Sequence, residues 1–185
     1  MRRPEVFFDY YTHHLISRTA QPNAAHRALA RLEEDGKLSA VITQNIDGLH
    51  QAAGSRSVIE LHGSVWRNHC LACAKPYALD EAPPDARGIP RCPACGGIVR
   101  PDVVLYGEPL DDGALSAAAQ ALARADALIV GGTSLAVYPA ASLLRYFTGD
   151  AIALINKTST PYDGHARIVI RAPIGEALAG VPEKP

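Results

Sequence analysis

The sequence predicts an α/β protein in which a parallel sheet is covered by helices in three layers and carries a small inserted module. Short, unbroken apolar segments alternate with helical segments, a pattern typical of parallel strands buried on both faces. Between residues 64 and 100 proline and glycine become frequent, and all four cysteines occur there. Hydrophobic residues make up 48% of the 185 positions and charged residues 20%, which is typical of a globular protein.

Two helices are predicted before the first strand. The first is expected over 4–18. Its apolar stripe would consist of Val6, Phe7, Tyr10 and Tyr11. The second is expected over 24–35, with Asn23 as N-cap and Gly36 ending it.

The remaining elements alternate in type. Strands are expected over 40–43, 58–63, 127–132, 151–156 and 166–171. Helices are expected over 112–125, over 139–147 and from about Gly175. The three-layer sheet follows from this alternation.

Charge and hydropathy exclude several classes of protein. Eighteen Lys and Arg against 19 Asp and Glu give a net charge of −1, which argues against a strongly basic nucleic-acid binder. No apolar segment approaches the ~20 residues of a membrane span. Asp9 interrupts the stretch that a signal peptide would need to be apolar. We therefore expect a cytoplasmic protein that binds neither nucleic acid nor membrane, whose cysteines serve a metal rather than disulfides.

The cysteines form two C-x2-C pairs, separated by residues 74–91. Each pair makes a tight turn that directs two thiolates at one point, and two such turns complete a tetrahedral site that suits zinc. A redox pair is the main alternative. The predicted ligands are Cys70, Cys73, Cys92 and Cys95. Four thiolates leave no open coordination position, so the predicted role is structural.

Polar residues follow three predicted strands. Gln44, Asn45, Ile46 and Asp47 follow the first, His62 follows the second, and the turn 131–134 (GGTS) follows another. Ligands of open parallel sheets bind at the carboxyl ends of strands, so these segments predict a site. A capping role for His62, a turn-forming role for Asp47 and either a turn or a ligand role for Asn156 remain alternatives.

Together these segments resemble the sirtuin family of NAD-dependent protein lysine deacylases. The motifs that carry the resemblance occur in the family's order: TQNIDGLH (43–50), ELHGS (60–64), the two C-x2-C pairs, RPDVVLYGE (100–108), GTSLAVYPA (132–140) and IN (155–156). The resemblance implies a Rossmann-like NAD-binding domain, 1–63 and 101–185, that carries a zinc-ribbon domain at 64–100. Acylated, first of all acetylated, lysine proteins would be its partners.

The resemblance also implies roles for single residues. His62 matches the general base that activates a ribose hydroxyl after the acyl oxygen has displaced nicotinamide, a task that suits an imidazole because its pKa lies near neutral. NAD contacts are implied for Gln44, Asn45, Ile46, Asp47, Gly132, Thr133, Ser134, Asn156 and Ile174. The substrate peptide is expected to add as a strand along Val103, Val104 and Gly107.

Two features depart from the family pattern. The glycine-rich GAG-x-S loop and the PDFR segment that open the family do not occur, so we expect a truncated start and exposed apolar surface where the first strand would pair. Members that prefer succinyl or malonyl lysine carry Tyr-x-x-Arg on the N-terminal helix. Here Tyr11 is followed at that spacing by His14, which favours acetyl.

Two other classes of function are alternatives to the deacetylase. A zinc-stabilised remnant would bind acyl peptide without turning over NAD. A zinc-ribbon nucleic-acid module would need a basic patch. Residues 64–100 carry five basic and three acidic side chains, which is too small an excess to support phosphate binding.

Overall fold

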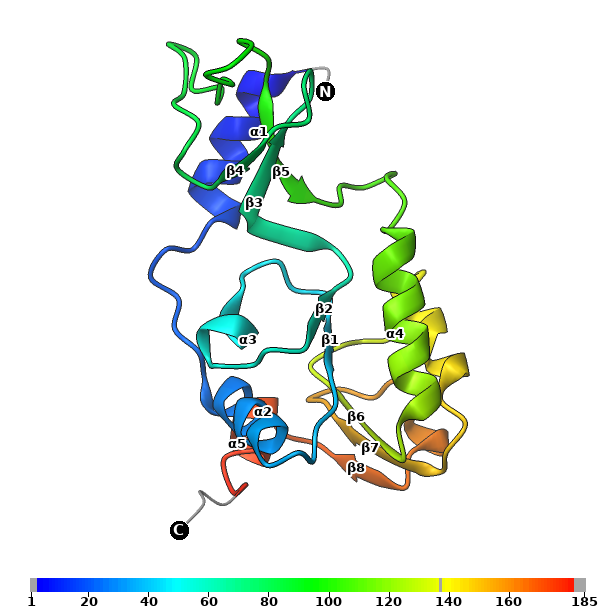
Figure 1. The fold of residues 1–185 in the computed structure, drawn as a ribbon. Coiled ribbons are helices and arrows are strands. Elements are labelled where there is room, and N and C mark those ends of the chain that lie inside the picture. The colour runs from blue at the N-terminus through cyan, green and yellow to red at the C-terminus, as the bar shows by residue number, and fades with distance from the viewer. Residues whose placement is uncertain (1–2, 137, 182–185) are drawn as a thin grey trace. The chain divides into compact units, whose positions relative to one another are not determined.

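The structure is a computed structural model that describes residues 3–136 and 138–181 (Figure 1). The chain forms two compact units. The first consists of Met1–Ala20, Asn45–Gly48 and His62–Pro109. The second consists of Gln21–Gln44, Leu49–Leu61 and Leu110–Pro185. The domain boundaries expected from the sequence stay a prediction, and the N-terminal helix and the segment 45–48 share a unit with the cysteines.

The first unit is built on an antiparallel sheet of order β4-β3-β5. Its elements are α1 (Pro4–Tyr10), the π-helical turn η1 (Tyr11–Leu15), β3 (Gly63–Cys70), β4 (Pro76–Ala78) and β5 (Val99–Val103). One core cluster joins the helix to the sheet through Phe8, Tyr11, Val65, Ile89 and Val103. A second cluster surrounds Cys70 and Cys92.

The N-terminal helix is shorter than predicted, and only part of the predicted apolar stripe is buried. The α-helix begins at Pro4, a favourable first position, and passes into the π-helical turn at Tyr11. Ile16 is extended, which ends the helical segment before residue 18. Val6 and Tyr10 are exposed, whereas Phe8 and Tyr11 are buried. The helix faces the sheet with Phe7, Phe8 and Tyr11, a narrower face than the predicted stripe.

The second unit contains the parallel strands. Its helices are α2 (Ala24–Glu34), α3 (Leu49–Ala52), α4 (Asp112–Arg124), α5 (Ile174–Ala177) and the 3-10 turns η2 (Ala140–Tyr146) and η3 (Asp163–His165). Its strands are β1 (Val41–Thr43), β2 (Val58–Glu60), β6 (Ala127–Gly131), β7 (Ala151–Ile155) and β8 (Ile168–Ile170). The strands and helices therefore follow the predicted order.

The parallel pairing is confirmed, but in two ladders. β1 pairs with β2, and the other ladder has the order β6-β7-β8. α2 and α5 pack together over the end of β7 around Ala28, Ile155 and Leu178. Apolar side chains of the second ladder remain exposed, namely Ile129, Ile168, Val169 and Ile170.

Local capping explains two further elements. The Asn23 side chain accepts from the backbone amides of Ala25 and His26, which confirms the predicted N-cap of α2. The helix predicted over 139–147 is a 3-10 helix instead. There the Ser142 hydroxyl donates to the carbonyl of Pro139, a local bond that competes with α-helical pairing.

In the part of the chain that is described, no helix has the length and hydropathy of a membrane span.

Candidate functional site

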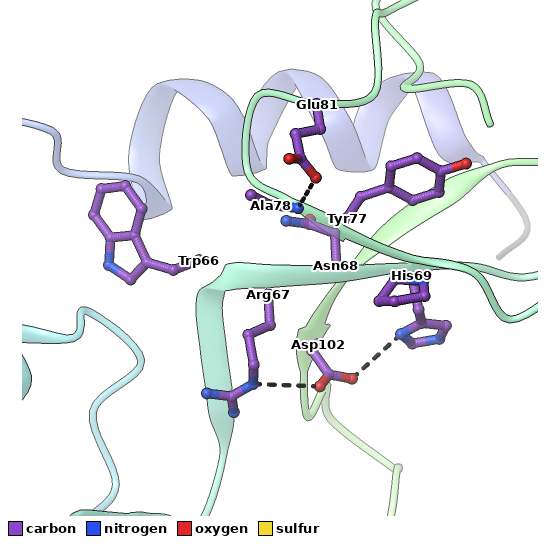
Figure 2. A pocket seen from close by; sticks show the side chains of 9 residues that line it. Trp66, Arg67, Asn68, His69, Tyr77, Ala78, Glu81 and Asp102 are labelled. Atoms are coloured by element: carbon purple, nitrogen blue, oxygen red, sulfur yellow. Dashed lines mark hydrogen bonds and ion pairs between the residues drawn. The ribbon is translucent and has the colours of Figure 1, made fainter. Parts of the chain in front are cut away.

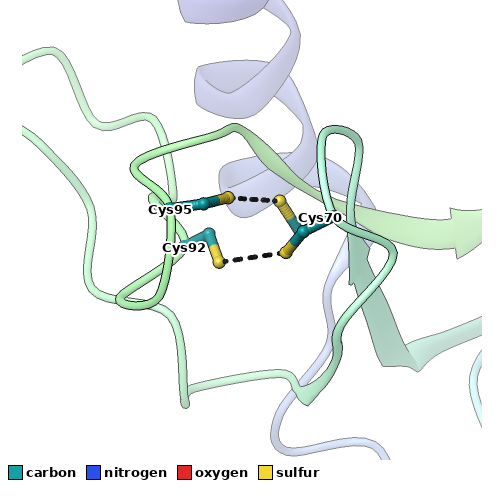
Figure 3. A group of neighbouring side chains, drawn as sticks. Cys70, Cys92 and Cys95 are labelled. Carbon is teal, nitrogen blue, oxygen red and sulfur yellow. Dashed lines mark hydrogen bonds between the residues drawn. The ribbon is translucent and has the colours of Figure 1, made fainter.

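The four predicted metal ligands converge. Their sulfur atoms all lie within 4.8 Å of one another (Figure 3 labels three of the four residues). Cys70 Sγ is 3.5 Å from Cys95 Sγ, and Cys73 Sγ is 3.7 Å from Cys92 Sγ. Zinc bound to four thiolates at about 2.3 Å requires sulfur atoms about 3.8 Å apart. The donor set and its spacing therefore fit a closed, structural zinc site.

One half of the site is buried: Cys70 and Cys92 are buried, whereas Cys73 and Cys95 are exposed. A side chain at Gly97 would approach Cys70 Sγ to 2.9 Å, so this glycine gives the thiols room. The Tyr77 hydroxyl lies 3.0 Å from Cys92 Sγ. This hydrogen bond, opposed by burial, lowers the pKa of the Cys92 thiol to about 6, and it raises the pKa of Tyr77 to about 12. Cys92 is thus prepared to act as a thiolate ligand.

Main-chain hydrogen bonds join the predicted catalytic and nicotinamide segments. The amide of Val65 donates to the carbonyl of Ile46 at 3.0 Å, and the amide of Val104 donates to the carbonyl of His62 at 3.0 Å. The segment 45–48, His62 and the start of the predicted peptide edge therefore belong to one framework. Gly107 lies further along the same loop.

Gly63 makes this arrangement possible. Its φ is +75°, and a Cβ there would lie 1.7 Å from the carbonyl oxygen of Asp102. Gly63 pairs with Val103 where β3 meets β5. The residue next to His62 must therefore be glycine, because the neighbouring strand passes too close for a side chain.

An ion pair braces the predicted peptide edge. The Arg100 guanidinium donates to both carboxylate oxygens of Glu108 at 2.7 and 3.0 Å and to the carbonyl of Val103 at 2.8 Å. Glu108 also accepts from the amide of Leu105 at 3.0 Å. The Arg100 hydrogen bond lowers the pKa of Glu108 to about 2. The loop after β5 is therefore held at both ends by one carboxylate.

The predicted adenosine contacts gather in the second unit, at the carboxyl ends of β6 and β7. The amide of Gly132 donates to the carbonyl of Ile155 at 3.1 Å, and Gly132 has a φ of +64°. Ile174 packs closely against Gly131: a Cβ added at Gly131 would lie 2.3 Å from Ile174 Cδ1. Gln44 and Ser134 also belong to this unit, directly after β1 and within the turn after β6.

Two of these side chains are engaged locally. The Asn156 side-chain amide donates to the carbonyl of Thr158 at 3.0 Å, which supports its turn-forming role. The Thr133 hydroxyl accepts from the amide of Leu135 at 3.1 Å, next to the positive φ of Leu135. Both interactions order the turns that carry the predicted ligand groups.

A surface pocket of about 560 Å³ lies elsewhere in the first unit (Figure 2). Asp102, one of the residues that line it, contacts both Arg67, at 3.7 Å, and His69, at 3.2 Å. None of the nine described residues that line it is a predicted cofactor residue.

Sequence reasoning missed three contributors: Trp66, Tyr77 and the Arg100–Glu108 pair. Each acts through a contact between separated segments. The sequence pointed to one of these contacts, because Arg100 and Glu108 are the first and last residues of the motif RPDVVLYGE. Tyr11, predicted as part of the apolar stripe, is buried in the core and stacks on Phe7, while His14, at the position of the family's arginine, is exposed beside Tyr10.

The sequence is similar to known bacterial proteins. The sequence is 54% identical over 177 residues to a protein of Clostridium acetobutylicum named NAD-dependent protein deacetylase, covering 96% of this chain and 72% of the relative. It is 55% identical over 181 residues to a protein of the same name from Cutibacterium acnes, with coverages of 98% and 73%.

Solved structures show the same likeness. One described as Sir2 bound to acetylated peptide superposes with a TM-score of 0.90 at 38% identity, covering 96% of this chain and 76% of that one. Another, described as Sir2–p53 peptide–NAD+, has a TM-score of 0.87 at 38% identity, with coverages of 96% and 76%. The sequence model of the Sir2 family matches residues 1–139, and the chain therefore belongs to the Sir2 family.

Proposed function

We propose that this protein removes acetyl groups from lysine side chains of proteins in an NAD-dependent reaction. One observation carries the assignment of residues: the hydrogen bonds that join His62, the segment 45–47 and the edge at Val104 into one framework. These bonds support the proposal, because they join the backbone of His62 to Val104 and the backbone of Ile46 to Val65. The family's relatives and the peptide-bound neighbours support the same reaction.

In this proposal each group has a distinct task. NAD supplies the ribose that accepts the acetyl group and the nicotinamide that leaves. His62 removes a proton from a ribose hydroxyl, which suits an imidazole near neutral pH. Asn45 and Asp47 bind around the nicotinamide, with Gln44 and Ile46 lining the same place. Gly132, Thr133, Ser134, Asn156 and Ile174 hold the adenosine half.

The peptide would be bound mainly through its backbone. Val103 ends β5, and Val104 and Gly107 follow it on the braced loop. An extended peptide can add to such an edge as a strand. Zinc would be held by the four cysteines and would stabilise the first unit without entering the reaction. A reducing, cytoplasmic location is part of the proposal, because these four cysteines are free thiols.

We propose acetyl rather than succinyl or malonyl as the acyl group. His14 takes the position at which the sequence resemblance would require arginine, and it is exposed on η1. A neutral imidazole gives a distal carboxylate no permanent counter-charge. Acetyl-lysine peptide should therefore be turned over faster than the matched succinyl-lysine peptide at pH 8.

The decisive experiment compares nicotinamide release by the 185-residue chain and by His62→Ala, with acetyl-lysine peptide and NAD. Loss of the general base should reduce kcat by about 10²–10⁴-fold. Zinc content and thermal unfolding should stay unchanged. His13→Ala, an exposed histidine of the same unit, is the matched control. Full activity of His62→Ala would refute the assignment, and an inactive but folded parent chain would refute the proposed function.

A further inference from the structure

Trp66 lies directly over the turn formed by Asp47 and Gly48. Its indole Nε1 donates to the carbonyl of Asp47 at 2.7 Å. A Cβ at Gly48 would lie 2.8 Å from both Cδ1 and Nε1 of the ring. Gly48 has a φ of +71°, so the turn requires glycine both for its backbone conformation and for the approach of the indole.

The neighbouring backbone contributes a second contact. The amide of Val65 donates to the carbonyl of Ile46, so consecutive residues of β3 bind consecutive residues of the segment 45–48. The amide of Trp66 in turn donates to the hydroxyl of Ser64 at 3.2 Å, and Ser64 is buried. This local bond lies at the irregularity of β3 between Ser64 and Asn68. Such irregularities redirect side chains, here the indole.

The segment needs this support because it has little structure of its own. Residues 44–46 are in neither helix nor strand, and Asp47 lies in a bend before α3. Side chains on such a segment keep a fixed direction only when the backbone is fixed from outside. Trp66 remains 42% exposed, so its position is explained by the hydrogen bond and the contact with Gly48 rather than by full burial.

We propose that Trp66 is a positioning residue that fixes the backbone of Asn45–Gly48 so that Asn45 and Asp47 are held ready for the nicotinamide end of NAD. This inference rests on the proposed function for the identity of the ligand. The contacts of Trp66 with Asp47 and Gly48, which we call the clamp, do not depend on the proposed function. Trp66 itself contacts the carbonyl of Asp47, so it acts through the segment.

The first test measures the segment itself. Trp66→Phe keeps an aromatic ring and removes the N–H donor, and Tyr10→Phe, which alters another exposed aromatic residue of the same unit, is the control. Hydrogen exchange followed by mass spectrometry should be about five- to tenfold faster in the peptide covering 45–48 for Trp66→Phe only, the effect of losing one hydrogen bond. Equal exchange in the parent chain and Trp66→Phe would overturn the inference.

The second test connects the segment to the cofactor. Trp66→Phe should raise KM for NAD and the inhibition constant for nicotinamide by about fivefold while leaving KM for the acetyl-lysine peptide unchanged. Faster exchange without a change in these two constants would overturn the cofactor role. A parent chain that folds but does not turn over NAD would refute the proposed function instead, and the exchange comparison would still decide whether the clamp exists.

The composition provides a direct spectroscopic readout. Trp66 is the single tryptophan of the chain, so all tryptophan emission comes from this position. Binding of NAD or nicotinamide should change the emission of the parent chain, and Gly48→Ala should change it without ligand because the added carbon displaces the indole. Unchanged emission in both experiments would contradict the placement of the ring over the turn.

Discussion

Gly63 and the backbone of Asp102 approach each other so closely that a Cβ on Gly63 would lie 1.7 Å from the Asp102 carbonyl oxygen. Backbone, unlike the end of a flexible side chain, cannot move away without disrupting the pairing of β3 with β5. That pairing continues into the hydrogen bond between the Val104 amide and the His62 carbonyl. The position of the proposed base therefore depends on a glycine beside it.

Gly63→Ala should destabilise the protein by about 2–4 kcal/mol, since it adds a steric clash to the strain of a positive φ. The deacetylation rate of Gly63→Ala should also be lower than that of the parent chain, at temperatures where the variant is still folded. Gly88→Ala is the matched control, because Gly88 has a φ of +74° and nothing within 4 Å of an added Cβ. It should cost only about 1–2 kcal/mol of conformational strain. Equal denaturation midpoints for the two variants would contradict the argument.

Tyr77→Phe should weaken zinc binding by about tenfold, the lower end of the effect of removing an outer hydrogen bond to a metal ligand. The reason is the 3.0 Å contact of its hydroxyl with Cys92 Sγ. Competition with a chromophoric chelator at pH 7.5 measures the affinity. Tyr106→Phe, on a fully exposed tyrosine, should bind zinc as the parent chain does. Equal affinity in Tyr77→Phe would show that the hydroxyl does not support the metal.

Glu108→Gln should lower the stability of the chain at pH 7 by about 1 kcal/mol, a value reduced for the partial exposure of the carboxylate. The folded-state pKa of Glu108 is lowered from 4.5 to about 2, first by Arg100. The stabilisation is therefore complete above pH 4.5 and is lost as the pH falls towards 2.

The measurement is the difference in free energy of unfolding between the parent chain and Glu108→Gln across pH 2–7. Zinc loss at acid pH affects both proteins, so only the difference is informative. Glu5→Gln, an exposed carboxylate of the same unit, is the control. A difference that persists unchanged down to pH 2 would show that the ion pair with Arg100 is not its source. The variant should also raise KM for the peptide, because the Arg100–Glu108 pair holds the carbonyl of Val103 and the loop that carries Val104.

Features governed by nearby residues were predictable from the sequence. The C-x2-C turns set their own thiol geometry, and the N-cap of α2 depends on residues two and three positions away. Features that depend on distant segments were not. The indole of Trp66 meets Asp47 only because β3 is irregular at that point, and Gly63 is required only because β5 passes beside it. The division of the parallel strands into two ladders likewise depends on pairing partners rather than on strand composition.

Gly131→Ala should weaken NAD binding through Ile174. A Cβ at Gly131 would lie 2.3 Å from Ile174 Cδ1, the end of a side chain that can turn away. Fold stability should therefore change little, whereas the proposed adenine-side contact should be displaced and KM for NAD should rise about fivefold, the equivalent of ~1 kcal/mol. Adding Ile174→Val removes the colliding methyl group and should restore part of the affinity. Gly164→Ala, with open space around it, should have no effect, and a double variant no better than Gly131→Ala would exclude Ile174 as the cause.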